Sequence, residues 1–289
     1  GGMSTVRFEK KGDLLSYTYL TAMDGTEAAI IEEVAAINYV ELYIGGQLID
    51  TQYQDYSSTQ WPALEANSYA KAAIAPDRAY PLHFFFCDNW TNALPLVALQ
   101  YHDVEIRIYW KVPDTSYRYQ CWSNFIYLDE AERKYFAENT QNMLIKQVQR
   151  SIPSAGKVQN FNFNHPVLYI GSPAAPNGVT DGTDTETSLQ FNINGVQSGE
   201  EMTLDPHFRT LNGYYHSPDC FDADMFSIPF ALNLCSNQPS GSLNFSRLDS
   251  SRLEIMQSDT PNAKFTGTFY AVNWNVLKIE NGMGGLMYS

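Results

Sequence analysis

Short motifs recur along this chain at a constant separation of about half its length. Three pairs show the repeat: Gly46 and Gly195 lie 149 residues apart, Cys87 and Cys235 lie 148 apart, and Val104–Ile106 and Leu253–Ile255 lie 149 apart. Self-similarity at a fixed period indicates a repeated structural unit. The sequence therefore predicts two tandem domains of one plan, residues 1–150 and 151–289, with Ser151–Gly156 as the linker.

Apolar and polar residues alternate with a period of two in several segments, most clearly in Val104–Trp110. Such alternation is typical of antiparallel strands that bury one face and turn the other outward. The pattern returns at Val40–Ile44, Phe161–Phe163, Leu189–Ile193, Leu253–Ile255 and Val272–Val276. Gly45–Gly46 and Asn194–Gly195 follow two of these strands, and such pairs tolerate the positive φ angles of hairpin turns. Many short strands with turn residues between them predict an all-β sandwich or jelly roll rather than a propeller.

One stretch predicts a good helix. Asp129 is a capping residue with Glu132 at the third helical position, as in a capping box. The apolar residues Leu128, Ala131, Tyr135 and Phe136 share one face, while Glu130, Arg133 and Lys134 point outward. We expect the helix to end at Asn139–Thr140, and Met143–Val148 fits either a helix or a strand.

The composition excludes several classes of protein. A net charge of −14 argues against a nucleic-acid binder, which needs clustered Lys and Arg to displace counterions. Hydrophobic residues make up 44% of the chain, which argues against disorder. No apolar run approaches the ~20 residues that span a bilayer. The chain is therefore predicted to be folded, acidic and rich in strands.

Residues with catalytic or metal-binding chemistry form no recognisable motif. The five histidines, His83, His102, His165, His207 and His216, form no zinc-binding pair, and neither a nucleophile elbow nor a P-loop is present. We expect Cys87, Cys121, Cys220 and Cys235 to be buried free thiols, since no C-x-x-C pair occurs. The sequence thus predicts no catalytic residue, no cofactor and no metal site.

Four further segments admit a functional and a structural interpretation. Asp181–Glu186 and Asp222–Asp224 carry the oxygen ligands that calcium prefers but lack the spacing of a calcium loop, so acidic surface turns are the simpler explanation. Pro81–Phe86 fits a ligand platform or a strand buried on both sides, and we favour the core strand. Gly282–Gly285 resembles a phosphate loop, but no helix follows, and we expect a flexible tail.

Two asparagines match the acceptor pattern for N-glycosylation. Asn89 begins Asn-Trp-Thr in a loop-like stretch, and Asn244 begins Asn-Phe-Ser in an apparent strand. Because an acceptor side chain has to be accessible, Asn89 is the better candidate of the two.

Longer segments carry a family resemblance. Four motifs contribute most to it, Val40–Asp50, Asn92–Val104, Gln238–Asp249 and Asn275–Leu286, with further likeness at Tyr127–Asp129 and Phe161–Pro166. The chain from Gly12 to its end resembles the major capsid proteins of large nucleocytoplasmic DNA viruses of the chlorella-virus and iridovirus type.

The resemblance implies a double jelly roll and a structural function in the virion, without catalysis. It also implies a homotrimer, whose six similar modules form a pseudo-hexagonal capsomer able to tile an icosahedral shell. The implied partners are further copies of the chain, neighbouring capsomers, minor capsid or cement proteins and an inner viral membrane, with no nucleic acid, and assembly is implied in the host cytoplasm. A minor capsid protein or a receptor- or glycan-binding tandem jelly roll is the alternative.

Two departures from the family pattern are expected. Family members carry an amino-terminal segment before Gly12–Leu14 that supplies a strand of the first jelly roll and an internal anchor, and we expect that segment to be absent here. The start Gly1–Gly2–Met3 has no initiator methionine, so we expect the chain to have been processed, tagged or trimmed at its front. The first jelly roll would then have an unprotected edge strand. The second departure is a short loop at Lys111–Tyr117, where family members often have long outer insertions.

Overall fold

The computed structural model describes residues 2–23, 29–30, 36–67, 79–111, 118–173, 187–217, 225–258 and 262–288. The chain divides into two compact units: unit 1 comprises Gly1–Ser58, Ile74–Gln147 and Asn275–Ser289, and unit 2 comprises Thr59–Ala73 and Val148–Trp274. Within the described ranges, no helix is both long and apolar enough to cross a bilayer. Four expectations lie wholly or mostly outside these ranges: Cys220, Asp181–Glu186, Asp222–Asp224 and the loop at Lys111–Tyr117.

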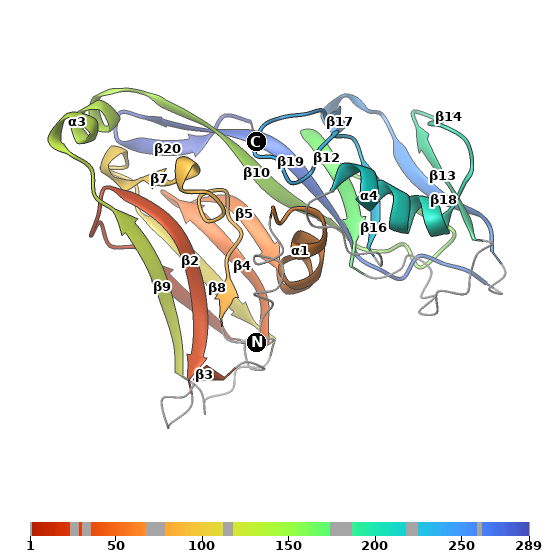
Figure 1. Ribbon diagram of the computed structural model, residues 1–289, viewed down its shortest axis with the longest axis horizontal. Coiled ribbons are helices and arrows are strands. Elements are labelled where there is room, and N and C mark those ends of the chain that lie inside the picture. Colours follow the sequence, from red (N-terminus) through yellow and green to blue (C-terminus); the bar gives the residue numbers. More distant parts are fainter. Residues whose placement is uncertain are drawn as a thin grey trace. The chain divides into compact units, whose positions relative to one another are not determined.

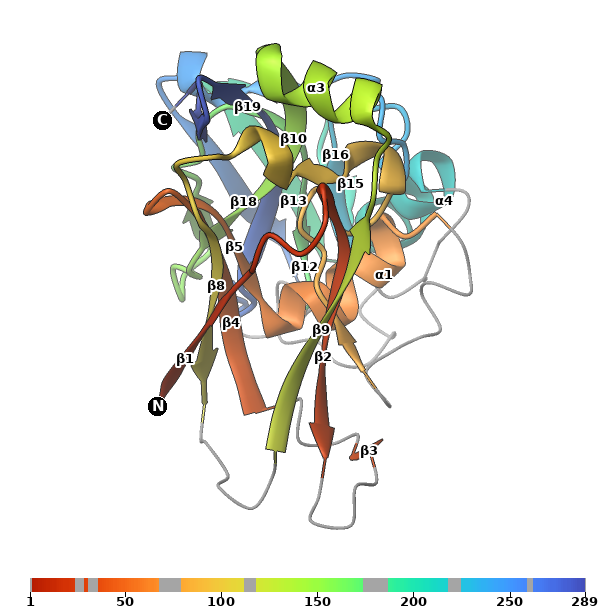
Figure 2. The same cartoon turned by 90° about the vertical axis from the view of Figure 1, so that its left-hand side faces the viewer.

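Two antiparallel sheets lie wholly within unit 1 (Figure 2). The first has the order β1 (Met3–Arg7), β8 (Val104–Trp110), β4 (Ile37–Ile44) and β5 (Gln47–Tyr53), so that β1 is an edge strand. In the second, the long strand β2 (Leu14–Met23) pairs with β3 (Ala29–Ile30), β6 (Tyr80–Pro81), β7 (Leu94–Pro95) and β9 (Arg118–Ile126).

Burial in unit 1 follows the predicted alternation. In β8, Val104, Ile106 and Ile108 are buried and belong to one core cluster, whereas the residues between them are half-buried. Strand β4 alternates in the same way. Both strands therefore confirm the prediction of single-faced strands made from period two.

Unit 2 repeats this arrangement with its own strands (Figure 1). Its first sheet has the order β11 (Val158–Asn160), β18 (Ser251–Gln257), β13 (Ser188–Ile193) and β14 (Val196–Gln197), and β15 (Met202–Thr203) also pairs with β13. In the second sheet, β12 (Pro166–Ser172) pairs with β16 (Phe226–Pro229), β17 (Leu243–Asn244) and β19 (Phe269–Glu280). β10 (Gln141–Ser151) and β20 (Met283–Leu286) also pair with β19, and the division between the units falls within β10 and β19.

The two sandwiches share one topology, which confirms the repeat. Strand order β1-β8-β4-β5 corresponds to β11-β18-β13-β14, and β2 with its partners β6, β7 and β9 corresponds to β12 with β16, β17 and β19. The hairpin turns match as well, because Gly45 and Gly46 have φ of 58° and 81°, and Asn194 and Gly195 have φ of 51° and 77°. Positive φ at both central residues is the conformation predicted for these turns.

Three predicted strands differ from what is observed. Strand β13 buries both faces, since Gln190 and Asn192 are buried and Gln190 donates to the Gly199 carbonyl at 3.4 Å. Phe161–Phe163 follows β11 as irregular chain, although both rings are buried. Pro81–Phe86 is a core segment as expected, but only Pro81 is in a strand and the three phenylalanines lie in a turn.

The described part of unit 2 includes a segment that comes from between β5 and β6 of unit 1. This arm, residues 59–67, contains the one-turn helix α1 (Trp61–Leu64), of which Trp61, Ala63 and Leu64 are buried. The Tyr169 hydroxyl of β12 donates to the Glu65 carboxylate at 2.7 Å. The arm therefore packs as a structural part of unit 2.

The expectation of a flexible tail at Gly282–Gly285 is wrong. Residues 283–286 form β20, which pairs with Leu277–Glu280 of β19. A Cβ at Gly282 would lie 2.6 Å from the Tyr101 ring and one at Gly284 would lie 2.8 Å from Leu99. These glycines are thus needed for close packing rather than for flexibility.

The Gly45–Gly46 turn allows a matched test of such a contact. Replacing Gly45 with alanine puts a Cβ 2.1 Å from Nδ1 of His102, whereas a Cβ at Gly46 meets nothing within 4 Å. Both φ angles are positive, so both variants carry backbone strain of about 1–2 kcal/mol, and we expect Gly45→Ala to lose roughly 1–3 kcal/mol more in unfolding free energy. The measurement is denaturant unfolding of both variants. In a His102→Ala background the two losses should become equal, because the ring that the Gly45 Cβ would meet is gone. Equal losses with His102 present would contradict the contact.

The arm predicts an unequal effect on the two units. Leu64→Ala removes a fully buried side chain and should lower the unfolding free energy by about 2–5 kcal/mol, with faster hydrogen exchange in β12 and β19. Leu48→Ala in β5, where the leucine is exposed, is the control and should change little. Exchange that rises in β2 and β8 but not in β12 would show that the arm does not support unit 2.

Candidate assembly surfaces

Across the described residues, no three or more His, Cys, Asp or Glu side chains gather as a metal site would require. The histidines instead make separate contacts. Nδ1 of His83 lies 3.4 Å from the Asp88 carboxylate, Nδ1 of His102 lies 3.0 Å from the Gly284 carbonyl, and Nδ1 of His216 lies 2.7 Å from the Ala231 carbonyl. Cys87, Cys121 and Cys235 are free thiols, of which Cys235 is buried and the other two are half-buried. The features that stand out are surfaces.

Four large aromatic side chains of unit 1, which come before β7, before β8 and after β9 in the chain, are exposed, and we name this set the aromatic end. Trp90, Tyr101, Tyr127 and Tyr135 are 74%, 75%, 71% and 60% exposed. Tyr135 belongs to helix α3 (Glu130–Glu138), which lies across one end of the unit 1 sandwich (Figure 2). Aromatic side chains at this exposure are typical of protein–protein contacts.

Helix α3 is held in place by polar contacts. Its cap is confirmed, because the Asp129 carboxylate accepts from the Glu132 N–H at 2.8 Å, and Asn139 ends it as expected. The expected apolar face is not buried, since no residue of α3 is. Instead Arg133, predicted to point outward, pairs with the Asp13 carboxylate at 2.9 Å.

Asp13 is the anchor of this arrangement. Its carboxylate accepts a 2.8 Å hydrogen bond from the Leu128 N–H in addition to the Arg133 contacts. The backbone hydrogen bond outweighs the opposing effect of burial and, together with Arg133, lowers the pKa of Asp13. Because Asp13 directly precedes β2, these contacts tie the helix to the sheet.

A second surface lies on the outer face of β4, β5 and β8, and we name it the tyrosine face. The rings of Tyr39 and Tyr109 stack at 4.4 Å, and Tyr53 lies 5.5 Å from Tyr39. The Arg107 guanidinium lies 3.9 Å from the ring centre of Tyr43. Desolvation raises the pKa of Tyr39, Tyr43 and Tyr109, so these hydroxyls stay neutral hydrogen-bonding groups.

Both candidate glycosylation residues start short helical turns. The Asn89 side-chain oxygen accepts from the Thr91 N–H at 3.1 Å, and the Asn244 oxygen accepts from the Ser246 N–H at 3.1 Å. Both side chains are half-buried, and Asn244 ends β17 as the sequence predicted.

Comparisons with known proteins agree on one family. A model of the large eukaryotic DNA virus major capsid protein matches residues 155–285, and a model of the major capsid protein N-terminus matches residues 1–129. The major capsid protein of Pyramimonas orientalis virus is 30% identical over 349 aligned positions, which cover all of this chain and 87% of the relative. The chain belongs to the major capsid proteins of large eukaryotic DNA viruses.

Other relatives support the fold. The major capsid protein of Paramecium bursaria Chlorella virus 1 is 28% identical, with all of this chain and 88% of the relative covered. A chain of the PBCV-1 virus capsid quasi-atomic model has a TM-score of 0.78 at 24% identity, covering 100% of this chain and 93% of that chain. The double jelly roll is therefore confirmed, and a capsid protein of this family is structural and non-enzymatic.

The sequence pointed to one of the two surfaces. The alternation of apolar and polar residues in β4 and β8 places Tyr39, Tyr43 and Tyr109 on the side away from the core. The sequence therefore contained a signal for the tyrosine face. The attachment of α3, which carries Tyr135, had no such signal, because it depends on Asp13 contacting Leu128 and Arg133 more than a hundred residues away.

The anchor of α3 makes a pH-dependent prediction. Asp13→Asn removes the charge beside Arg133 and should lower the unfolding free energy at pH 7 by roughly 1–3 kcal/mol. Since the folded pKa is depressed, the contribution of Asp13 is complete above the ordinary value of 3.8 and is lost as pH falls through the folded pKa. Denaturant unfolding from pH 7 to pH 2.5 should show the difference vanish at the acid end. Glu9→Gln, at an exposed ion pair, is the control, and a difference independent of pH would contradict the anchor.

Proposed function

We propose that this capsid protein forms homotrimeric capsomers of pseudo-hexagonal outline that tile an icosahedral shell. The observation that carries the proposal is the shared topology of the two sandwiches, because three chains with two similar modules each present six similar modules. Hexagonal blocks of this kind fill a flat facet. The relatives named as major capsid proteins, and the likeness to a chain of the PBCV-1 virus capsid, support it.

The two surfaces supply what such assembly needs. The aromatic end has exposed anchors, and the tyrosine face combines tyrosine with arginine, the residue types enriched at interface hot spots. We propose that copies of the chain, neighbouring capsomers and minor capsid or cement proteins use these surfaces. A contact with an inner viral membrane and assembly in the host cytoplasm complete the proposal.

Two finer assignments belong to the same proposal. The sequence duplication divides the chain into two halves, residues 1–150 and 151–289. The arm then belongs to the first half in sequence and to unit 2 in the structure. Asn89 and Asn244 are proposed acceptors for glycans, to be tested by peptide mass mapping of protein from particles.

The decisive measurement is the native mass. A trimer weighs about 98 kDa, three times the 32.7 kDa chain, and light scattering should give that mass or larger assemblies. Negative-stain images of the same fraction should show six-fold outlines. A stable 32.7 kDa species at all concentrations would contradict the proposal.

A further inference from the structure

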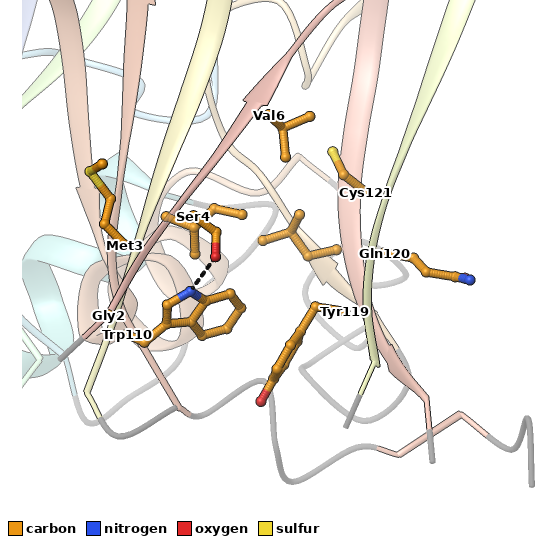
Figure 3. Close-up of a pocket in the computed structure, with 10 residues that line it drawn as sticks. Gly2, Met3, Ser4, Val6, Trp110, Tyr119, Gln120 and Cys121 are labelled. Atoms are coloured by element: carbon orange, nitrogen blue, oxygen red, sulfur yellow. Dashed lines mark hydrogen bonds between the residues drawn. The ribbon is translucent and has the colours of Figure 1, made fainter. Parts of the chain in front are cut away.

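A pocket of about 290 Å³ lies between the two sheets of unit 1 (Figure 3) and opens to the surface beside the exposed residues Gly2–Ser4. It sits between β1 and β8 of one sheet and β2 and β9 of the other. Its apolar walls include Val6, Leu20, Ile108 and Trp110, and Tyr119 and Cys121 face these from β9. The described residues that line it all belong to unit 1.

The cavity exists because short side chains face each other across the sandwich. Ser4 and Val6 of β1 lie opposite Ile108 and Ile106 of β8, and the facing strand offers Cys121. Sheets stack about 10 Å apart, so side chains of this length leave space between them.

Unit 2 fills the equivalent space, which makes it an internal comparison. Strand β19 in unit 2 corresponds to β9 in unit 1, because β19 pairs with β12 as β9 pairs with β2. Phe269 of β19 is fully buried, and its ring lies 5.2 Å from Phe161 and 5.7 Å from Phe265. The same fold therefore packs phenylalanines from sheet to sheet in one copy and leaves a cavity in the other.

The chemistry of the walls defines what fits. Among the residues that the structure describes, no charged side chain lines the pocket, and the indole N–H of Trp110 donates to the Ser4 hydroxyl at 3.0 Å. Burial raises the pKa of the Cys121 thiol to about 11, so it is uncharged at neutral pH. An apolar cavity of about 150 Å³ holds a benzene, so a pocket of about 290 Å³ has room for a somewhat larger apolar molecule, whereas a helix, about 10 Å across, is too wide.

We propose that the unit 1 cavity binds one uncharged, apolar small molecule, of the size of an aromatic ring with a short alkyl chain. A molecule there touches β1 on one side and β9 on the other. β1 is an edge strand whose residues are mostly exposed and whose only strand partner among the described residues is β8. Occupation of the cavity therefore fastens β1 to the sandwich.

The test uses the full chain with ethylbenzene as the probe and phenylacetate as its charged counterpart. Ethylbenzene should bind saturably and slow hydrogen exchange of the β1 amides at least threefold, while phenylacetate at equal concentration should do neither. Absence of saturable ethylbenzene binding, or equal effects of the two compounds, would overturn the proposal.

Variants place the binding in this cavity. Val6→Phe fills the space from β1 and Cys121→Leu fills it from β9, so each should abolish ethylbenzene binding, and the second remains informative where the first fails to fold. Thr5→Phe adds the same ring to the outer side of β1 and should leave binding intact. Ethylbenzene binding that persists in both filling variants would contradict the proposal, because the probe would then bind elsewhere. The proposal would also be contradicted if self-assembly protected the β1 amides without the probe and prevented the probe from binding.

Discussion

The sheet of β12 and β19 has to be covered on both faces, and much of the chain's organisation follows from this constraint. Phe269 and Ala271 of β19 face the core of unit 2, and Tyr270 and Val272 on the opposite face are equally buried. Residues 59–67 lie on that second face, where Gln60 contacts Gly171 and Glu65 binds Tyr169. Losing either cover would expose a row of apolar side chains to water. The connection between β5 and β6 is therefore a structural element, and unit 2 is completed by a segment that is remote in sequence.

Local signals explain why so much of the architecture can be predicted from the sequence. A strand buried on one face repeats every two residues, as in β8, and a tight hairpin turn needs positive φ, as at Gly45–Gly46 and Asn194–Gly195. The duplication adds a second, independent copy of each signal. These features predict strands, turns and two matching sandwiches without any knowledge of distant contacts.

What could not be predicted depends on distant residues. The alternation in β13 predicts that Gln190 faces solvent. Its side chain is instead buried and donates to the Gly199 carbonyl. The glycine-rich residues 282–285 predict a flexible tail. Tyr101 and Leu99 instead occupy the space that side chains at Gly282 and Gly284 would need. The prediction for helix α3 is wrong in the opposite direction. Its apolar face predicts burial, but the helix is held by contacts to Asp13 and that face is not buried. The attachment of α3 could not be anticipated for that reason.

The placement of charge bears on how an acidic chain can pack against copies of itself. Several ion pairs join residues two apart on one strand, which share a face: Glu105 with Arg107, Arg252 with Glu254 and Lys278 with Glu280. Such pairs add little stability when exposed. They do, however, make a strand face nearly neutral locally in a chain whose net charge is −14. Repulsion between like-charged surfaces grows with unpaired charge at the contact. In the proposed shell, faces built from tyrosine and same-strand ion pairs can therefore meet closely.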